Sequence, residues 1–226
     1  MKRLLAFVLT LMLAMTMGMT LVGCGETPES GGEEAVAKDV QLVETGYSLS
    51  EENYLTFAFV INNPTEDTAF EFTDITVTAY DENGDVLATG DQMMNKIQPG
   101  ETQTFASILD CNGQKPDKVE FDIDSGEEMS PADDAIKSSD LEISGTNERN
   151  DEYGETSITG NIKNNAAIDT ESVAVTVLFK KDGKIVSGST DFVDNLGAGK
   201  EKAFEIIEYD VPEHDSYEVL GLDWGF

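Results

Sequence analysis

Residues 77–105 read VTAYDENGDVLATGDQMMNKIQPGETQTF, and residues 176–204 read TVLFKKDGKIVSGSTDFVDNLGAGKEKAF. At an offset of 99 the two stretches share an aromatic residue, a turn glycine, a branched apolar residue and a closing Gly and Phe. The matched pairs are Tyr80 with Phe179, Gly84 with Gly183, Val86 with Ile185, Ile97 with Leu196, Gly100 with Gly199 and Phe105 with Phe204. Self-similarity at a fixed spacing indicates a repeated structural unit. The sequence therefore predicts two copies of one domain.

Each copy has the pattern of an all-β domain. Residues 54–61 (YLTFAFVI) are aromatic and β-branched, and they end at an Asn-Asn-Pro that breaks a strand. Asn62-Asn63 matches Asn164-Asn165 at an offset of 102, which predicts a shorter loop in the second copy. Asn83-Gly84 and Asp182-Gly183 lie between apolar alternations and predict type I′ hairpins.

Short strands separated by frequent turns, without a helical stripe, are typical of an Ig-like sandwich. We therefore expect two tandem Ig-like antiparallel β-sandwich domains, at residues 39–124 and 139–226; a small Greek-key barrel is the alternative. Residues 125–138 form the expected linker, with about one helical turn beginning at Ser130 and Pro131.

The N-terminus predicts export. Lys2 and Arg3 precede an apolar run, and Leu21-Val22-Gly23-Cys24 resembles the lipobox of bacterial lipoproteins. We expect residues 1–23 to be a signal peptide, Cys24 to be lipidated, and residues 24–38 to be a disordered tether rich in Gly and Glu. The alternative for the apolar run is an uncleaved transmembrane anchor. In both cases the body of the protein lies outside the cytoplasm.

The charge of the chain excludes one class of partner. It carries 45 acidic residues against 14 basic ones, for a net charge of −31. Such a surface repels DNA, RNA and anionic headgroups, so we expect no nucleic-acid partner. A cationic partner or an envelope protein remains compatible with it, besides the membrane contact through the lipid on Cys24.

The repeats also resemble a known family. The pattern of Asn-Asn, an apolar strand ending in an aromatic residue, a turn and a closing Phe is similar to the FxLYD domain of bacterial surface lipoproteins. The naming motif falls on residues 77–81 (VTAYD) and 176–180 (TVLFK), and residues 116–121 and 213–219 occupy the place of the family's last strand. Copy one keeps only the Tyr-Asp, and copy two substitutes Phe and Lys. The resemblance implies a compact β-sandwich on the cell surface and brings no catalytic residue or ligand.

The residues that carry catalysis are scarce. His214 is the single histidine, and no G-x-S-x-G accompanies it. One histidine and one remaining thiol, Cys111, are too few for a zinc site. Cys111 is expected to be a small residue at a strand end, with a reactive thiol as the alternative. We therefore expect no catalytic residue, no enzymatic activity and no resident cofactor or metal.

Calcium is the one ion that the sequence leaves open. Asp81-Glu82-Asn83-Gly84-Asp85 alternates oxygen-bearing side chains, but Val86 stands where an EF-hand needs glycine. Adventitious calcium at Asn147, Glu148, Asp151 and Glu152 is the alternative.

These observations predict a non-enzymatic, lipid-anchored binding or interaction module on the outer face of the bacterial cell membrane. A passive spacer or accessory subunit of an envelope complex, or a calcium-stabilised surface domain, is the alternative. At the end of the chain, Trp224 and Phe226 are expected to be core residues of a last strand.

Overall fold

The structure is a computed structural model that describes residues 38–225. The predicted signal peptide, Cys24, almost all of the tether and Phe226 lie outside the described residues. Within residues 38–225 the chain is built of strands, apart from one short 3-10 turn. None of the described segments is a helix with the length and hydropathy needed to cross a membrane.

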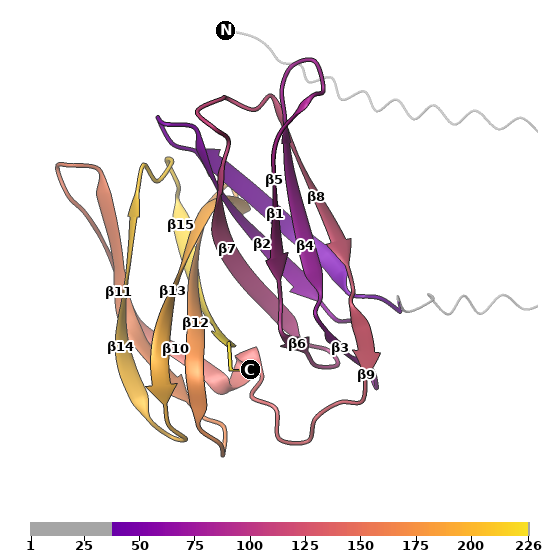
Figure 1. Cartoon of the computed structure of the whole chain (residues 1–226). Coiled ribbons are helices and arrows are strands. Elements are labelled where there is room, and N and C mark those ends of the chain that lie inside the picture. The colour runs from indigo at the N-terminus through magenta and orange to yellow at the C-terminus, as the bar shows by residue number, and fades with distance from the viewer. Residues whose placement is uncertain (1–37, 226) are drawn as a thin grey trace, which may run out of the picture. The chain divides into compact units, whose positions relative to one another are not determined.

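The first copy contains nine strands in three antiparallel sheets (Figure 1). The sheet β1-β2-β7 faces the sheet β5-β4-β8, and a small sheet, β6-β3-β9, lies at one end. The strands are β1 (Gln41–Leu49), β2 (Tyr54–Asn62), β3 (Ala69–Glu71), β4 (Asp74–Tyr80), β5 (Val86–Met93), β6 (Lys96–Ile97), β7 (Thr102–Asp110), β8 (Lys118–Asp124) and β9 (Glu127–Met129). Phe57, Phe59, Ile75 and Val77 are buried between the two large sheets.

The second copy contains six strands in two antiparallel sheets, β10-β11-β14 and β13-β12-β15. The strands are β10 (Leu141–Asn150), β11 (Glu155–Asn164), β12 (Thr170–Lys181), β13 (Lys184–Leu196), β14 (Glu201–Tyr209) and β15 (Ser216–Asp223). Its core contains Ile158, Ile162, Val175 and Phe179. The chain is thus an all-β protein of two antiparallel sandwiches, which confirms the predicted fold class.

The strand registers correct the alignment of the two copies. Ala79 pairs with Ala88 and with Val119, and Phe179 takes the same place, opposite Ser187 and Tyr217. Ala79 is therefore the counterpart of Phe179, and the predicted match of Tyr80 with Phe179 is wrong by one residue. Because successive side chains in a strand point to opposite faces, this slip exchanges the core face for the outer face. Tyr80 lies on the outer face, whereas Phe179 is fully buried.

A buried asparagine has the same role in both copies. Asn63 Nδ2 donates to the carbonyl oxygens of Thr68 (2.8 Å) and Ile97 (3.2 Å). Asn164 Nδ2 donates in the same way to those of Ile168 (2.8 Å) and Leu196 (3.2 Å). The true offset here is 101, so the predicted match at 102 is also wrong by one residue.

The two predicted type I′ hairpins differ from each other. Asp182 and Gly183 have φ values of 52° and 75°, as a type I′ turn requires. In the first copy only Gly84 has a positive φ (85°), while Asp81 Oδ1 accepts the N–H groups of Asn83 and Asp85. The type I′ prediction is therefore wrong there: the loop is one residue longer, and the glycine takes the left-handed position that follows an Asp-capped turn.

The segment between the copies also differs from the prediction. Glu127–Met129 forms β9 and pairs with β3, and the only helical turn in this segment is the 3-10 turn at Ser138–Asp140. The predicted turn at Ser130 is wrong. Ser138 is bound instead by the buried Glu101, whose Oε1 accepts both the backbone N–H (3.0 Å) and the hydroxyl (3.1 Å) of that serine. Burial raises the pKa of Glu101, and these hydrogen bonds oppose that shift.

The two copies belong to one compact unit and contact each other through unlike sheets. The outer face of β1-β2-β7 packs on the outer face of β13-β12-β15, where Ala58, Ala106, Leu178 and Ile185 form a buried cluster. Glycines permit the close approach: a Cβ on Gly188 would lie 2.8 Å from the Cβ of Ala58. This contact buries one outer face of each copy and leaves the outer faces of β5-β4-β8 and β10-β11-β14 uncovered by the other copy.

Candidate functional site

One end of the second copy is polar where the first copy is apolar. In the first copy Leu49, Leu55 and Leu109 form a cross-strand row over β1, β2 and β7. The corresponding row over β10, β11 and β14 is Asn150, Thr156 and Glu208. Burying polar groups costs free energy unless they are hydrogen-bonded, and the same fold is built with leucines in the first copy. The polar row is therefore not required by the fold.

The polar row is partly satisfied within itself. The Thr156 hydroxyl, in a residue that is 5% exposed, donates to Asn150 Oδ1 at 2.8 Å. Glu208 follows the buried Phe204 and Ile206 on the inner side of β14, so the alternation of the strand directs its carboxyl toward β13. Burial raises the pKa of the Glu208 carboxyl, and a hydrogen bond from Ser189 opposes the shift.

A pocket of about 600 Å³ opens beside this row. It lies between β10, β11 and the loop that joins β14 to β15. Its floor includes Glu148, Asn150, Thr156 and His214, and the loop residues Val211, Pro212, Glu213, Asp215, Ser216 and Tyr217 complete the lining.

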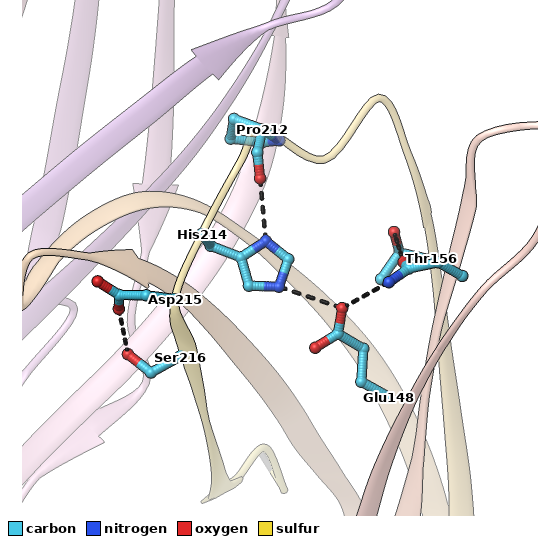
Figure 2. A network of polar contacts seen from close by, with 7 residues as sticks. Glu148, Thr156, Pro212, His214, Asp215 and Ser216 are labelled. Atoms are coloured by element: carbon cyan, nitrogen blue, oxygen red, sulfur yellow. Dashed lines mark hydrogen bonds and ion pairs between the residues drawn. The ribbon is translucent and has the colours of Figure 1, made fainter.

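His214 is held at both ring nitrogens (Figure 2). Its Nδ1 lies 2.9 Å from the Pro212 carbonyl oxygen, and its Nε2 lies 3.2 Å from Glu148 Oε1. A carbonyl oxygen and a carboxylate both only accept hydrogen bonds. The ring of His214 is therefore held between two hydrogen-bond acceptors, one at each nitrogen.

Packing fixes the same ring from its other side. The imidazole lies against the buried Phe179, with ring centroids 4.9 Å apart, and the His214 side chain is 13% exposed. The neighbouring Asp215 accepts the backbone N–H of Asp182 and the hydroxyl of Ser216. These hydrogen bonds, the first above all, lower the pKa of the Asp215 carboxyl. The loop that carries His214 is therefore tied to the β12–β13 turn.

The arrangement lacks a coupled nucleophile. The Ser216 hydroxyl turns toward Asp215, away from the imidazole, and both nitrogens of His214 are engaged by Pro212 and Glu148 (Figure 2). A serine nucleophile needs a base within hydrogen-bond reach of its oxygen. The pocket offers an imidazole, a carboxylate and an amide, which are groups for holding a polar ligand or a side chain of a partner.

Three of the residues weighed for calcium, Asp81, Asp151 and Glu148, have other roles in the structure. Asp81 Oδ1 and Asp151 Oδ1 each accept two backbone N–H groups of their own hairpin loops. Glu148 is bound to His214. Over residues 38–225 there is no group of three or more Asp, Glu, His or Cys side chains placed to hold a metal ion.

Cys111 is completely buried at the end of β7. Burial, and to a lesser degree the neighbouring Asp110, raises the pKa of its thiol. A thiol with a raised pKa forms little of the reactive thiolate at neutral pH.

The sequence predicted a solvated loop histidine at His214, which is wrong because the ring packs on Phe179 and is 13% exposed, and it gave no indication of Asn150 or Thr156. An alignment of the copies at the correct offset of 101 would have found both, because it sets them against Leu49 and Leu55. Trp224 was expected in a strand core; it stacks on Phe105 of the first copy instead, with ring centroids 4.7 Å apart.

Neither the models of known protein families nor the curated proteins contain a match to this chain. The fold and the site define its class: an Ig-like, all-β protein of two sandwiches, of which the second carries a polar pocket at its end.

Proposed function

We propose that this chain is a non-enzymatic, lipid-anchored surface protein that binds a partner in the bacterial envelope through the polar end of its second copy. One observation carries the proposal: the row of leucines that closes the first copy is replaced by Asn150, Thr156 and Glu208 beside the His214 pocket. Positions that depart from what the fold requires are where function is expected. A passive spacer gives no reason for this departure.

The location in the envelope rests on the sequence. Cys24 follows a lipobox-like Leu-Val-Gly, and the two repeats resemble the FxLYD domains of bacterial surface lipoproteins. A diacylglyceryl group on Cys24 carries two acyl chains, which suffice for stable anchoring. Replacement of Cys24 by Ala is expected to release the protein from the membrane fraction, and retention of the variant there would contradict the anchor.

Site-specific photo-crosslinking in living bacteria tests the binding role. A photoreactive amino acid at Glu213, on the rim of the pocket, should capture one dominant partner that mass spectrometry identifies. The same amino acid at Asp122, on the outer face of β5-β4-β8, is the matched control and should not capture it. The second variant His214→Ala should reduce the capture from position 213. Identical products from both positions, unaffected by His214→Ala, would favour the passive spacer.

A further inference from the structure

A second groove, of about 320 Å³, lies where three strand edges come together. Within residues 38–225, β7 pairs only with β2, β13 only with β12, and β14 only with β11, so each strand has one edge without a strand partner. The groove is lined by Phe105 and Ile108 from β7, Ser189 and Phe192 from β13, and Glu208 from β14. Open strand edges are templates for the backbone of another chain.

The edge of β7 is oriented for such pairing. The N–H of Ala106 points away from β2 and donates to the Thr190 hydroxyl at 3.0 Å. In an antiparallel ladder the backbone groups of alternate residues face the same side, so the N–H and C=O of Ile108 face the open edge as well. The Thr190 side chain of the second copy therefore occupies the edge of β7 at Ala106, whereas the edge at Ile108 stays open.

Apolar side chains stand beside that open part. Ile108 is 57% exposed and Phe192 is 44% exposed. Phe192 rests on Trp224, at a centroid distance of 5.9 Å, and Trp224 stacks on Phe105. Exposed apolar groups on a rigid aromatic base are typical of the anchor points of an interface.

Glu208 supplies a charge at the wall of the groove. Its counterpart in the first copy, Leu109, is a core residue, so the carboxylate replaces an apolar group that the fold accepts. None of the ion pairs found in the described part of the chain includes Glu208. A half-buried carboxylate without a cation is complementary to a lysine or arginine brought by a partner.

Charge also decides which occupant fits. The chain has a net charge of −31, which disfavours a second copy at this edge. Its own residues 24–38 contain Glu26, Glu29, Glu33 and Glu34 and a single lysine, Lys38, so this acidic segment is a poor match for Glu208.

We propose that this groove binds an extended segment of a partner protein that carries lysine or arginine next to apolar residues. The backbone of the segment adds to the open edge of β7 at Ile108, an apolar side chain packs on Phe192, and a cation pairs with Glu208. The inference rests on the proposed binding function and names the chemistry of the partner and a second contact surface for it.

The chain supplies its own reporter for a test, because Trp224 is the single tryptophan and lies under the groove. The probe is an acetylated and amidated nonapeptide that repeats Thr-Lys-Ile three times. In an extended strand this sequence places lysine and isoleucine on both faces. A saturable change in Trp224 fluorescence at physiological ionic strength is expected on titration, and a peptide with glutamate in place of lysine should produce none.

Variants distinguish the groove from general attraction to an acidic protein. Glu208→Gln and Phe192→Ser should each weaken binding about tenfold or more, because they remove the cation's partner and the apolar anchor. Glu52→Gln, on an exposed loop of the first copy, removes the same charge elsewhere and should leave the affinity unchanged. Thermal unfolding of each variant verifies that the fold is retained.

Absence of saturable binding, or equal weakening by Glu208→Gln and Glu52→Gln, would overturn the groove proposal. Such a result leaves the proposed function open to its own test, because capture from position 213 beside the His214 pocket does not depend on the peptide. Conversely, peptide binding in the groove without any partner captured in cells would support the groove chemistry and contradict the pocket as the binding surface.

Discussion

Single asparagine side chains close the same loops in both copies. Asn164 is fully buried, its Nδ2 bonds two carbonyl oxygens, and its Oδ1 accepts the N–H of Ala166 at 2.9 Å. Asn63 repeats the donor pattern with Thr68 and Ile97. One side chain thus satisfies three backbone groups, which explains why an amide and no apolar residue stands there.

Replacement of Asn164 by Ala is therefore expected to be costly. It removes the donor to the buried carbonyl oxygen of Leu196 and to the partly buried one of Ile168, at about 2–4 kcal/mol of the free energy of unfolding. Urea denaturation followed by circular dichroism measures the change. Asn165→Ala is the matched control: Asn165 is exposed and its side-chain amide bonds the side chain of Glu142, so little change is expected. Equal stability of the two variants would show that the buried amide is not needed.

The sequence predicted the elements better than it predicted their alignment. Two copies, β-strands and a turn at Asp182-Gly183 followed from alternation and turn residues, because both signals are local. The offset in residue number between matched positions of the two copies changes along the chain. It is 101 at Asn63, 100 at Ala79 and 99 at Phe105, because each copy has loops of its own length. The predicted offsets of 99 at Tyr80 and 102 at Asn62-Asn63 each misplace a strand by one residue, and for a strand one residue is the difference between core and surface.

That slip concealed the site. The departure of Asn150 and Thr156 from the leucine pattern is visible only when the correct strand register is known. The contact between the copies was equally out of reach of the sequence, because a face of Ala58 and Ala106 resembles an ordinary core face until the opposing sheet is seen.

Carboxylates oppose each other across the outer face of β5-β4-β8. Asp74 lies directly opposite Asp124, and one of its carboxylate oxygens is buried without a hydrogen-bond partner. Burial, and then repulsion by Asp91 and Asp124, raises the pKa of Asp74 above its ordinary value of 3.8. Like charges in a cross-strand pair destabilise a sheet.

We expect Asp74→Asn to stabilise the fold at neutral pH and not in acid. A raised pKa in the folded state means that the folded protein binds the proton more tightly than the unfolded chain. The ionised carboxyl therefore costs stability in full above its folded pKa, and the cost fades as the pH falls toward 3.8. The variant should melt about 1–3 °C higher than the parent at pH 7.

Calorimetry at several pH values tests the sign of this effect. The gain from Asp74→Asn should shrink as the pH falls through the raised pKa of the folded state, and it should disappear only below the ordinary value of 3.8. Asp67→Asn, at an exposed loop carboxyl, is the control and should show no gain of this kind. A gain that persists unchanged in acid would contradict the electrostatic cause.

Two glycines, Gly46 and Gly188, lie on the faces that the copies bury against each other. Gly46 lies on β1, and a Cβ there would stand 2.2 Å from the carbonyl oxygen of Ile185. The register places Asn147 at the position of Gly46 in the second copy, and Thr89 at the position of Gly188 in the first. Each glycine is thus present only in the copy whose face is covered.

The variant Gly46→Ala should therefore disturb the contact between the copies. The backbone of Ile185 must move to admit the methyl group, which costs about 1–3 kcal/mol. Denaturation followed by Trp224 fluorescence reports on this contact, because Trp224 of the second copy stacks on Phe105 of the first. Gly197→Ala meets only the flexible side chains of Lys200 and Asp169 and serves as the control. A midpoint equal to that of the parent would argue against a tight contact at Gly46.

One uncovered face of the first copy is polar where the matching face of the second copy is apolar. The face of the second copy that packs on the first contains Ala174, Leu220 and Leu222. The corresponding residues on the uncovered face of the first copy are Asp74, Asp122 and Asp124. A repeat whose outer face is polar acts as a cap, because it cannot bury that face against a further unit. Carboxylates at these three positions keep the exposed sheet from acting as another docking face.

The triple variant Asp74→Ala, Asp122→Leu and Asp124→Leu places the docking residues of the second copy on this uncovered sheet. We expect it to associate with rising concentration, because an apolar patch appears while three repelling charges are lost. Light scattering coupled to size-exclusion chromatography measures the mass. The triple variant Asp74→Asn, Asp122→Asn and Asp124→Asn removes the same charges without adding apolar surface and should keep the mass of the parent. Association of both variants alike would assign the capping to charge alone, and association of neither would show that these carboxylates do not limit the number of units.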